Sequence, residues 1–175
     1  LGDVYKRQVL VLAVPRGAAA DVTKAVGSAA DGKTVIDVSN AVTGNMELAV
    51  GFTTSAAEEI QKMLPKAHVV KAFNTVFAQN QSSGKIGDEQ LTLFVAGDNP
   101  EAKKTVMRLG ADIGFEPVDG GLLKAARYLE PMGMFMISLG YVLGMGTSIG
   151  FKLVKSWKLR TLSAVAAVDT AASDK

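Results

Sequence analysis

The sequence predicts an α/β fold built on a mostly parallel sheet. Short apolar runs rich in Val and Ile alternate along the chain with segments of helical periodicity, a pattern typical of β-α-β units. The apolar runs are continuous rather than alternating, as expected for strands that helices cover on both faces. The 175 residues, 48% of them hydrophobic and 21% charged, suffice for one globular domain with a sizeable core.

Five segments have the pattern of buried strands: Val9–Val14, Thr34–Val38, His68–Phe73, Leu91–Ala96 and the short run Phe115–Val118. Pro15 and Gly17 end the first strand, and Ser39 and Asn40 follow the second. Ligands of parallel sheets bind outside the carboxyl ends of the strands. We therefore expect a site in the loops after the first three strands.

Helices are predicted between these strands, at Ala18–Ala30, from Ser55 to Pro65, after Asp98 or Asn99, and near Leu122–Glu130. Ser55 and Glu58 have the spacing of a capping box, in which each residue satisfies a free backbone N–H of the other. Pro100 stands in the first turn of the third helix, where its missing N–H costs nothing.

The stretch from Pro131 to Phe151 carries no charge. As a helix it would be about 30 Å long, enough to cross a bilayer. Its five glycines weaken a continuous helix, and the preceding β-α-β pattern needs this segment to cover the sheet. The sequence therefore favours a buried helix and a loop packed against a site or against a second subunit. A homodimer is expected on this basis, and a membrane span is not.

Composition excludes several kinds of site. The chain has no cysteine and a single histidine, His68, so no thiolate or His-rich metal site is expected. The net charge of +2 shows no basic cluster that would indicate nucleic-acid binding. The residues before the first strand do not have the pattern of a signal peptide, so none is expected, and a cytoplasmic location is expected. No nucleophile–base pair is apparent, which disfavours hydrolysis but not hydride transfer between bound cofactors.

Turn-forming residues (Pro, Ser or Asn) follow each of the first three strands, in the segments Ala13–Pro15, Asp37–Ala41 and Ala72–Thr75. Taken singly, each has a purely structural interpretation: a rigid strand exit at Pro15, and turns stabilised by Ser and Asn side chains. Because the carboxyl ends of parallel strands share one edge of the sheet, the three together indicate a binding site for a flat ligand.

Five stretches carry a family resemblance: VLAVP, DVSN, VVKAFNT, the long run VAGDNPEAKKTVMRLGADIGFEPVDGGLLKAARYLEP, and GMGTSIGFKL. In this order and spacing they resemble the NADPH-dependent coenzyme F420 reductases over about residues 9–153. The DVSN and KAFN stretches are also similar to the oxidoreductase domain of the STEAP metalloreductases.

This resemblance implies a Rossmann domain that binds NADP and exchanges a hydride with a deazaflavin (coenzyme F420) or a flavin. Carried over by position, it implies that Val14 and Pro15 line the nicotinamide end of the dinucleotide and that Asn40 lies by the nicotinamide or its ribose. It further implies two groups around the second ring: Ala72, Phe73 and Asn74 where the cofactors meet, and Gly121 and Leu122 flanking the deazaflavin or flavin.

The sequence departs from this family in two respects. It contains no G-x-G-x-x-G after a strand, and it lacks the basic or Ser/Thr residues that follow the family's second strand and hold the 2′-phosphate. We expect residues 9–151 to be a partial domain that lacks its first strands and phosphate-binding loop, and that binds NADP weakly or not at all when alone. Residues 152–175 are expected to form a basic and then disordered tail. Residues 1–8 are expected to be a non-native leader, since DVYKRQ is the translation of GATGTGTATAAGAGACAG, a transposon end used in sequencing libraries.

Two alternatives remain open at this point. The same fold could reduce a flavin or another acceptor such as a small imine. The chain could instead be a non-catalytic or membrane-associated nucleotide-binding subunit that uses the uncharged stretch as its anchor.

Overall fold

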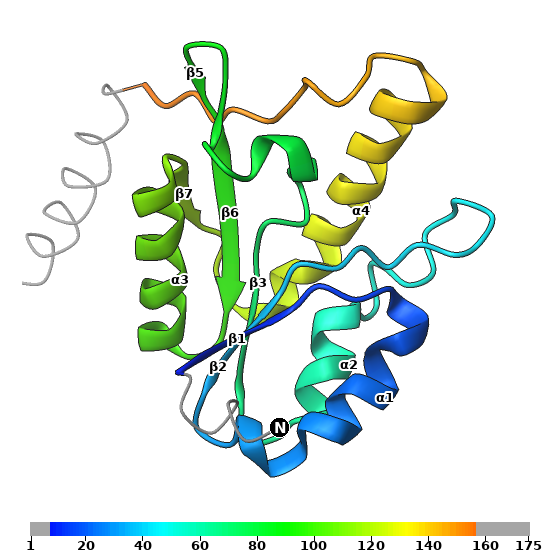
Figure 1. Cartoon of the computed structure of the whole chain (residues 1–175), viewed down its shortest axis with the longest axis vertical. Helices are drawn as coiled ribbons and strands as arrows, with labels where there is room; N and C mark the ends of the chain where they lie inside the picture. The colour runs from blue at the N-terminus through cyan, green and yellow to red at the C-terminus, as the bar shows by residue number, and fades with distance from the viewer. Residues whose placement is uncertain (1–7, 157–175) are drawn as a thin grey trace, which may run out of the picture.

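The computed structural model describes residues 8–156, and its centre is a five-stranded sheet in the order β1-β2-β3-β6-β7 (Figure 1). These strands span Val9–Leu12, Thr34–Asp37, His68–Lys71, Thr92–Gly97 and Glu116–Asp119. A small separate hairpin joins β4 (Lys85–Ile86) to β5 (Glu89–Gln90). All five predicted strands are present, within a few residues of the expected bounds.

The sheet is mostly parallel but reverses direction once. Strands β1, β2 and β3 are parallel to one another, and β6 is parallel to β7. Between these groups β3 and β6 are antiparallel, with Val70 opposite Gly97 and Lys71 opposite Ala96. The carboxyl ends of β1–β3 therefore point to one edge of the sheet, and those of β6 and β7 point to the other.

Helices lie on both faces of the sheet, with α1 (Arg16–Val26) and α2 (Ala56–Met63) on one side and α3 (Pro100–Ile113) on the other (Figure 1). Successive side chains of a strand point to opposite faces. Accordingly Val35 and Val69 pack in the core beneath α1 and α2, whereas Ile36 and Val70 pack in the core beneath α3. This explains the continuous hydrophobicity of the strands.

The predicted helix starts are confirmed, with one difference at Ser55: the Glu58 carboxylate binds the Ser55 hydroxyl rather than the Ser55 N–H. The Ser55 hydroxyl accepts a hydrogen bond from the Glu58 N–H and donates one to the Glu58 carboxylate. At the start of α3, Asn99 Oδ1 accepts from the Ala102 N–H at 2.9 Å, with Pro100 as the first helical residue. These local interactions fix where α2 and α3 begin.

The uncharged stretch forms the end of one helix and then an irregular segment. Helix α4 spans Ala126–Ile137 after a short turn at Leu123–Ala125, and a π-helical turn continues it over Ser138–Val142. The chain then returns to the sheet, where the Thr92 N–H donates to Phe151 O and the Leu153 N–H donates to Thr92 Oγ1. Within residues 8–156 no helix combines the length and apolarity needed to cross a bilayer.

Only the edges of the two expected terminal segments are described. The carbonyl of Gln8 accepts a hydrogen bond from the Thr34 N–H, and the other seven leader residues lie outside the described part. Lys152 and Lys155 form ion pairs with Glu89 and Glu116. The start of the expected tail is therefore pinned to the domain, and the expectation of disorder concerns residues outside those described.

Candidate functional site

The ends of β1, β2 and β3 lie together at one edge of the sheet, as predicted. The Val38 N–H donates to Leu12 O at 3.3 Å, and the Ala72 N–H donates to Asp37 O at 3.2 Å. These bonds continue the sheet past the last paired residues. They bring the segments that contain Val14 and Pro15, Asn40, and Ala72–Asn74 to a common edge.

Two of the predicted residues, Asn40 and Asn74, are in direct contact. Asn74 Nδ2 donates to Asn40 Oδ1 at 3.3 Å and to the backbone carbonyl of Leu129 in α4 at 2.7 Å. Because a carbonyl oxygen only accepts, the bond to Leu129 fixes which way the Asn74 amide faces. We refer to Asn40 and Asn74 as the amide pair.

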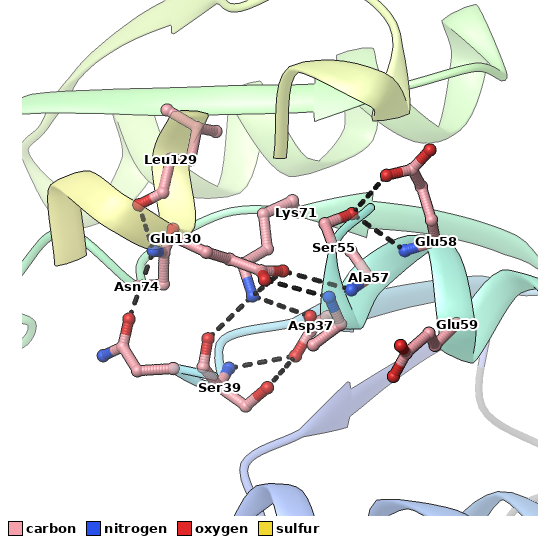
Figure 2. A network of polar contacts seen from close by, with 12 residues as sticks. Asp37, Ser39, Ser55, Ala57, Glu58, Glu59, Lys71, Asn74, Leu129 and Glu130 are labelled. Atoms are coloured by element: carbon pink, nitrogen blue, oxygen red, sulfur yellow. Dashed lines mark hydrogen bonds and ion pairs between the residues drawn. The ribbon is translucent and has the colours of Figure 1, made fainter. Parts of the chain in front are cut away.

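Directly beside the amide pair lies a buried charge cluster of Asp37, Lys71 and Glu130, whose side chains are all fully buried (Figure 2). Lys71 Nζ stands 2.7 Å from Asp37 Oδ2 and 3.2 Å from Glu130 Oε1. It also donates to the Ser39 carbonyl at 2.7 Å. The other oxygen of Asp37 accepts from the Ser39 N–H and hydroxyl.

Glu130 also caps a helix from a distance. Its carboxylate accepts hydrogen bonds from the Ala56 and Ala57 N–H groups at 2.9 and 3.1 Å, so its negative charge sits at the N-terminus of α2 (Figure 2). The charge cluster thereby joins β2, β3, α2 and α4. Its members are satisfied by one another, which makes it a structural support for the site rather than a set of reactive groups.

A second ion pair ties α2 to α4 nearer the surface. Arg127 donates twice to the Glu58 carboxylate, at 2.7 and 2.8 Å. This hydrogen-bonded guanidinium holds the pKa of Glu58 below its usual value, and raises the pKa of Arg127 in turn.

A groove of about 620 Å³ opens next to the strand ends, between α1, α2 and the loop that follows β2. Its walls include Arg16, Ser39, Thr43 and Met63, and Arg16 forms an ion pair with Glu59 at 3.0 Å. Gly17 lies on the same wall, where nothing stands within 4 Å of a side chain added there. The groove is mostly apolar with a few polar groups, as is usual for small-molecule sites.

The remaining predicted residues are placed differently. Ala72 and Phe73 are buried, and Phe73 contacts the Phe115 ring edge-on with centroids 5.8 Å apart. Phe73 has φ 66°, an uncommon backbone conformation for such a bulky side chain. Gly121 and Leu122 follow β7, and the Gly121 carbonyl accepts from the Gly97 N–H at the carboxyl end of β6. The reversal at β6 therefore places Gly121 and Leu122 toward the opposite edge from the amide pair.

Sequence reasoning missed the charge cluster. The sequence indicates Asp37 only as the first residue of the segment Asp37–Ala41, and it assigns no role to Lys71 or Glu130. A lysine inside the apolar run HVVKAF is a usable signal, because lysine is almost never fully buried unless it is paired. Its partners come from positions 34 and 59 residues away and cannot be found from spacing. In the described part of the chain no three His, Cys, Asp or Glu side chains are grouped to hold a metal ion.

Comparison with known proteins finds both groups that the motifs resemble. The chain is 33% identical over 135 residues to metalloreductase STEAP3 of Rattus norvegicus, covering 77% of this chain and 23% of that protein. It is 32% identical over 113 residues to metalloreductase STEAP2 of Homo sapiens, covering 63% of this chain and 22% of that protein. The chain thus spans less than a quarter of the length of these curated relatives. No family model matches it.

Solved structures extend the comparison to the fold. A protein of Arthrobacter sp. FB24, provisionally named an F420-dependent NADP reductase, superposes with a TM-score of 0.80 at 26% identity, covering 87% of this chain and 71% of that one. A hypothetical protein of Sinorhizobium meliloti superposes with a TM-score of 0.64 at 28% identity, covering 89% and 70%. The predicted Rossmann-like architecture with a mostly parallel sheet is confirmed.

Proposed function

We propose that this chain is part of an NADP(H)-dependent oxidoreductase and that it holds the nicotinamide end of the dinucleotide at the carboxyl edge of β1–β3. The observation that carries this proposal is the convergence of Pro15, Asn40 and Asn74 on that edge, in a chain similar to a named NADP reductase and to metalloreductases. Both names imply hydride or electron transfer.

The groups at the edge fit a nicotinamide. Asn40 and Asn74 offer an amide donor and an amide acceptor, the complement of a carboxamide. Pro15, which is exposed at the end of β1, gives a rigid wall without an N–H that would need a partner. When bound, NADPH supplies the hydride and water supplies the accompanying proton. The protein's own residues then bind, orient and shield the ring, so no acid or base of this chain is needed.

The hydride acceptor is proposed as a planar isoalloxazine-type ring, either the deazaflavin coenzyme F420 or a flavin. Similarity to a protein named for coenzyme F420 favours the deazaflavin. The groove beside Ser39 and Met63 is mostly apolar, opens next to the proposed nicotinamide position and would take this ring or part of it.

Of the two outcomes expected for the chain alone, weak binding of NADP or none, the proposal requires weak binding. It is tested by ligand-observed saturation-transfer NMR on the 175-residue chain, a method that detects binding in the millimolar range. We expect NADP+ to receive saturation on its nicotinamide protons more than on its adenine protons, and AMP to receive none. Saturation on the adenine alone, or no saturation of NADP+ at any concentration, would contradict the proposal. Addition of coenzyme F420 or of FMN to chain and NADPH, followed by NADPH fluorescence, then identifies the acceptor.

A further inference from the structure

We propose that helix α4 locks the amide pair in a single orientation, so that Asn40 presents N–H donors and Asn74 presents a C=O acceptor to a ligand. This pair would select a planar ring with an amide edge, in which a carbonyl acceptor and an N–H donor are neighbours. Both the nicotinamide carboxamide and the imide of a flavin or deazaflavin have such an edge. The inference rests on the proposed function. It adds the feature that selects the ligand, which is the fixed orientation of the two amides, and the residues that hold this orientation.

The orientation follows from one backbone contact. Asn74 Nδ2 donates to Leu129 O, which cannot donate, so the nitrogen of this amide faces α4. Its second N–H faces Asn40, and the oxygen of the Asn40 amide must therefore face Asn74. Asn40 Nδ2 and Asn74 Oδ1 are the atoms left over, one a donor and the other an acceptor.

The leftover atoms are unpartnered and not fully enclosed. In residues 8–156 every fully buried side-chain nitrogen or oxygen has a hydrogen-bond partner. Asn40 Nδ2 and Asn74 Oδ1 form no hydrogen bond with the described residues, so each keeps some exposed surface, on a half-buried residue for Asn40 and on a residue that is 5% exposed for Asn74. A ligand that bonds to both would replace water at two positions whose geometry is already set, and would lose little entropy in doing so.

Gly133 of α4 allows this arrangement. A Cβ at this position would collide with Asn40 Oδ1, and would stand 2.8 Å from Asn74 Nδ2 and 2.9 Å from Asn74 O. Real Cβ atoms essentially never come within 3.0 Å of a neighbouring heavy atom. Gly133 is therefore the position at which α4 touches the amide pair, and any other residue there would displace Asn40 or Asn74.

The charge cluster holds α4 in place for this role. Glu130 follows Leu129 directly, and its carboxylate is bound by Lys71 and by the N-terminus of α2. Lys71 also binds the carbonyl of Ser39, the residue before Asn40. Lys71 thus positions two backbone segments. Through Ser39 it holds the backbone before Asn40, and through Glu130 it holds the backbone of Leu129, whose carbonyl binds Asn74. Lys71, Glu130 and Gly133 are positioning residues, because none of them is placed to touch the ligand.

The test compares ligands that differ by one group, using dissociation constants from saturation-transfer titrations of the full chain. NADP+ is paired with its 3-acetylpyridine analogue, which keeps the carbonyl and lacks the N–H donor. FMN is paired with N3-methyl FMN, in which the imide N–H is blocked. We expect one of these pairs to show about 3- to 10-fold weaker binding of the analogue, the effect of one neutral hydrogen bond. The ligand whose analogue binds more weakly carries the ring, nicotinamide or isoalloxazine, that the amide pair recognises.

Two variants test the positioning. Gly133→Ala should bind each ligand and its analogue equally, whereas the matched Gly44→Ala, with open space around the new methyl group and outside the groove lining, should keep the wild-type ratio. Asn40→Asp, in which the outward donors are lost, should reduce binding of both members of the discriminated pair and leave their ratio unchanged. Should Gly133→Ala not fold, side-chain amide hydrogen exchange of the wild type decides the orientation: the Asn74 NH₂ should be protected and the Asn40 NH₂ should not.

The inference would be overturned if wild-type chain binds ligands and analogues equally, or if the Asn40 NH₂ is the protected one. In either case NADP+ would still receive saturation on its nicotinamide protons, and the proposed function would stand. Absence of that saturation would instead overturn the proposed function.

Discussion

Replacing Lys71 by methionine should destabilise the protein strongly without changing its fold. Methionine keeps most of the length and volume of the lysine stem but removes the charge. The substitution leaves the carboxylates of Asp37 and Glu130 fully buried without their shared cation, and leaves the Ser39 carbonyl without its donor. Removing one partner of a buried ion pair typically costs about 3–5 kcal/mol.

The structure places the expected cost near the lower end of that range. Asp37 keeps two hydrogen bonds from Ser39, and Glu130 keeps the two N–H groups at the start of α2. We therefore expect a loss of about 3 kcal/mol in the free energy of unfolding. For a chain of this size that corresponds to a fall of about 6–12 °C in Tm.

Urea and thermal denaturation followed by circular dichroism measure this loss. Lys104→Met is the matched control, because Lys104 is exposed on α3 and its substitution should change stability by less than about 0.5 kcal/mol. The double variant Asp37→Asn with Lys71→Met should cost less than the sum of the two single variants, since each removes the same interaction. A Lys71→Met variant within 1 kcal/mol of wild type, at an unchanged denaturant slope, would refute the reasoning.

Three further outcomes are expected. Gly133→Ala should lower stability by about 1–3 kcal/mol through overpacking, whereas Gly17→Ala in open space should raise it slightly; equal effects in denaturation would be contrary to this account. Because the pKa of Glu58 is lowered, its bond with Arg127 stabilises the protein at pH values above the ordinary glutamate pKa of 4.5, and this contribution is lost as the pH falls through 4.5 and below. Arg127→Met should therefore flatten this part of the plot of unfolding free energy against pH. A plot that the substitution leaves unaltered would contradict this expectation. Sedimentation should detect a dimer that the exposed Phe135 of α4 helps to form, so that Phe135→Asp lowers the mass; a monomeric wild type would count against the expected dimer.

The parts of the fold that depend on neighbours in sequence could be predicted. Strand positions follow from apolar runs such as VVKAF, and the starts of α2 and α3 follow from Ser55 and Asn99, whose caps act within three residues. The common edge of β1–β3 also follows, because successive strands of a sheet that are joined by a helical crossover run parallel to each other.

The parts of the fold and of the site that depend on contacts between residues distant in the sequence could not be predicted. Nothing near β6 indicates that it runs antiparallel to β3, and this reversal moves Gly121 and Leu122 away from the predicted site. Gly133 looked like a weak point of a helix, but its role is set by Asn40, which lies 93 positions earlier in the chain and contacts it only in the folded state. Glu130 likewise caps α2 across 73 and 74 positions of sequence.

The central claim is that the carboxyl edge of β1–β3 binds the nicotinamide end of NADP(H). Two-dimensional amide NMR of the labelled chain, titrated with NADP+, tests it most directly. The account predicts shifts confined to four segments: residues 13–17, 38–43, 72–75 and 129–133. Shifts centred on α3 and β7, or a spectrum that NADP+ leaves unchanged at millimolar concentration, would contradict it.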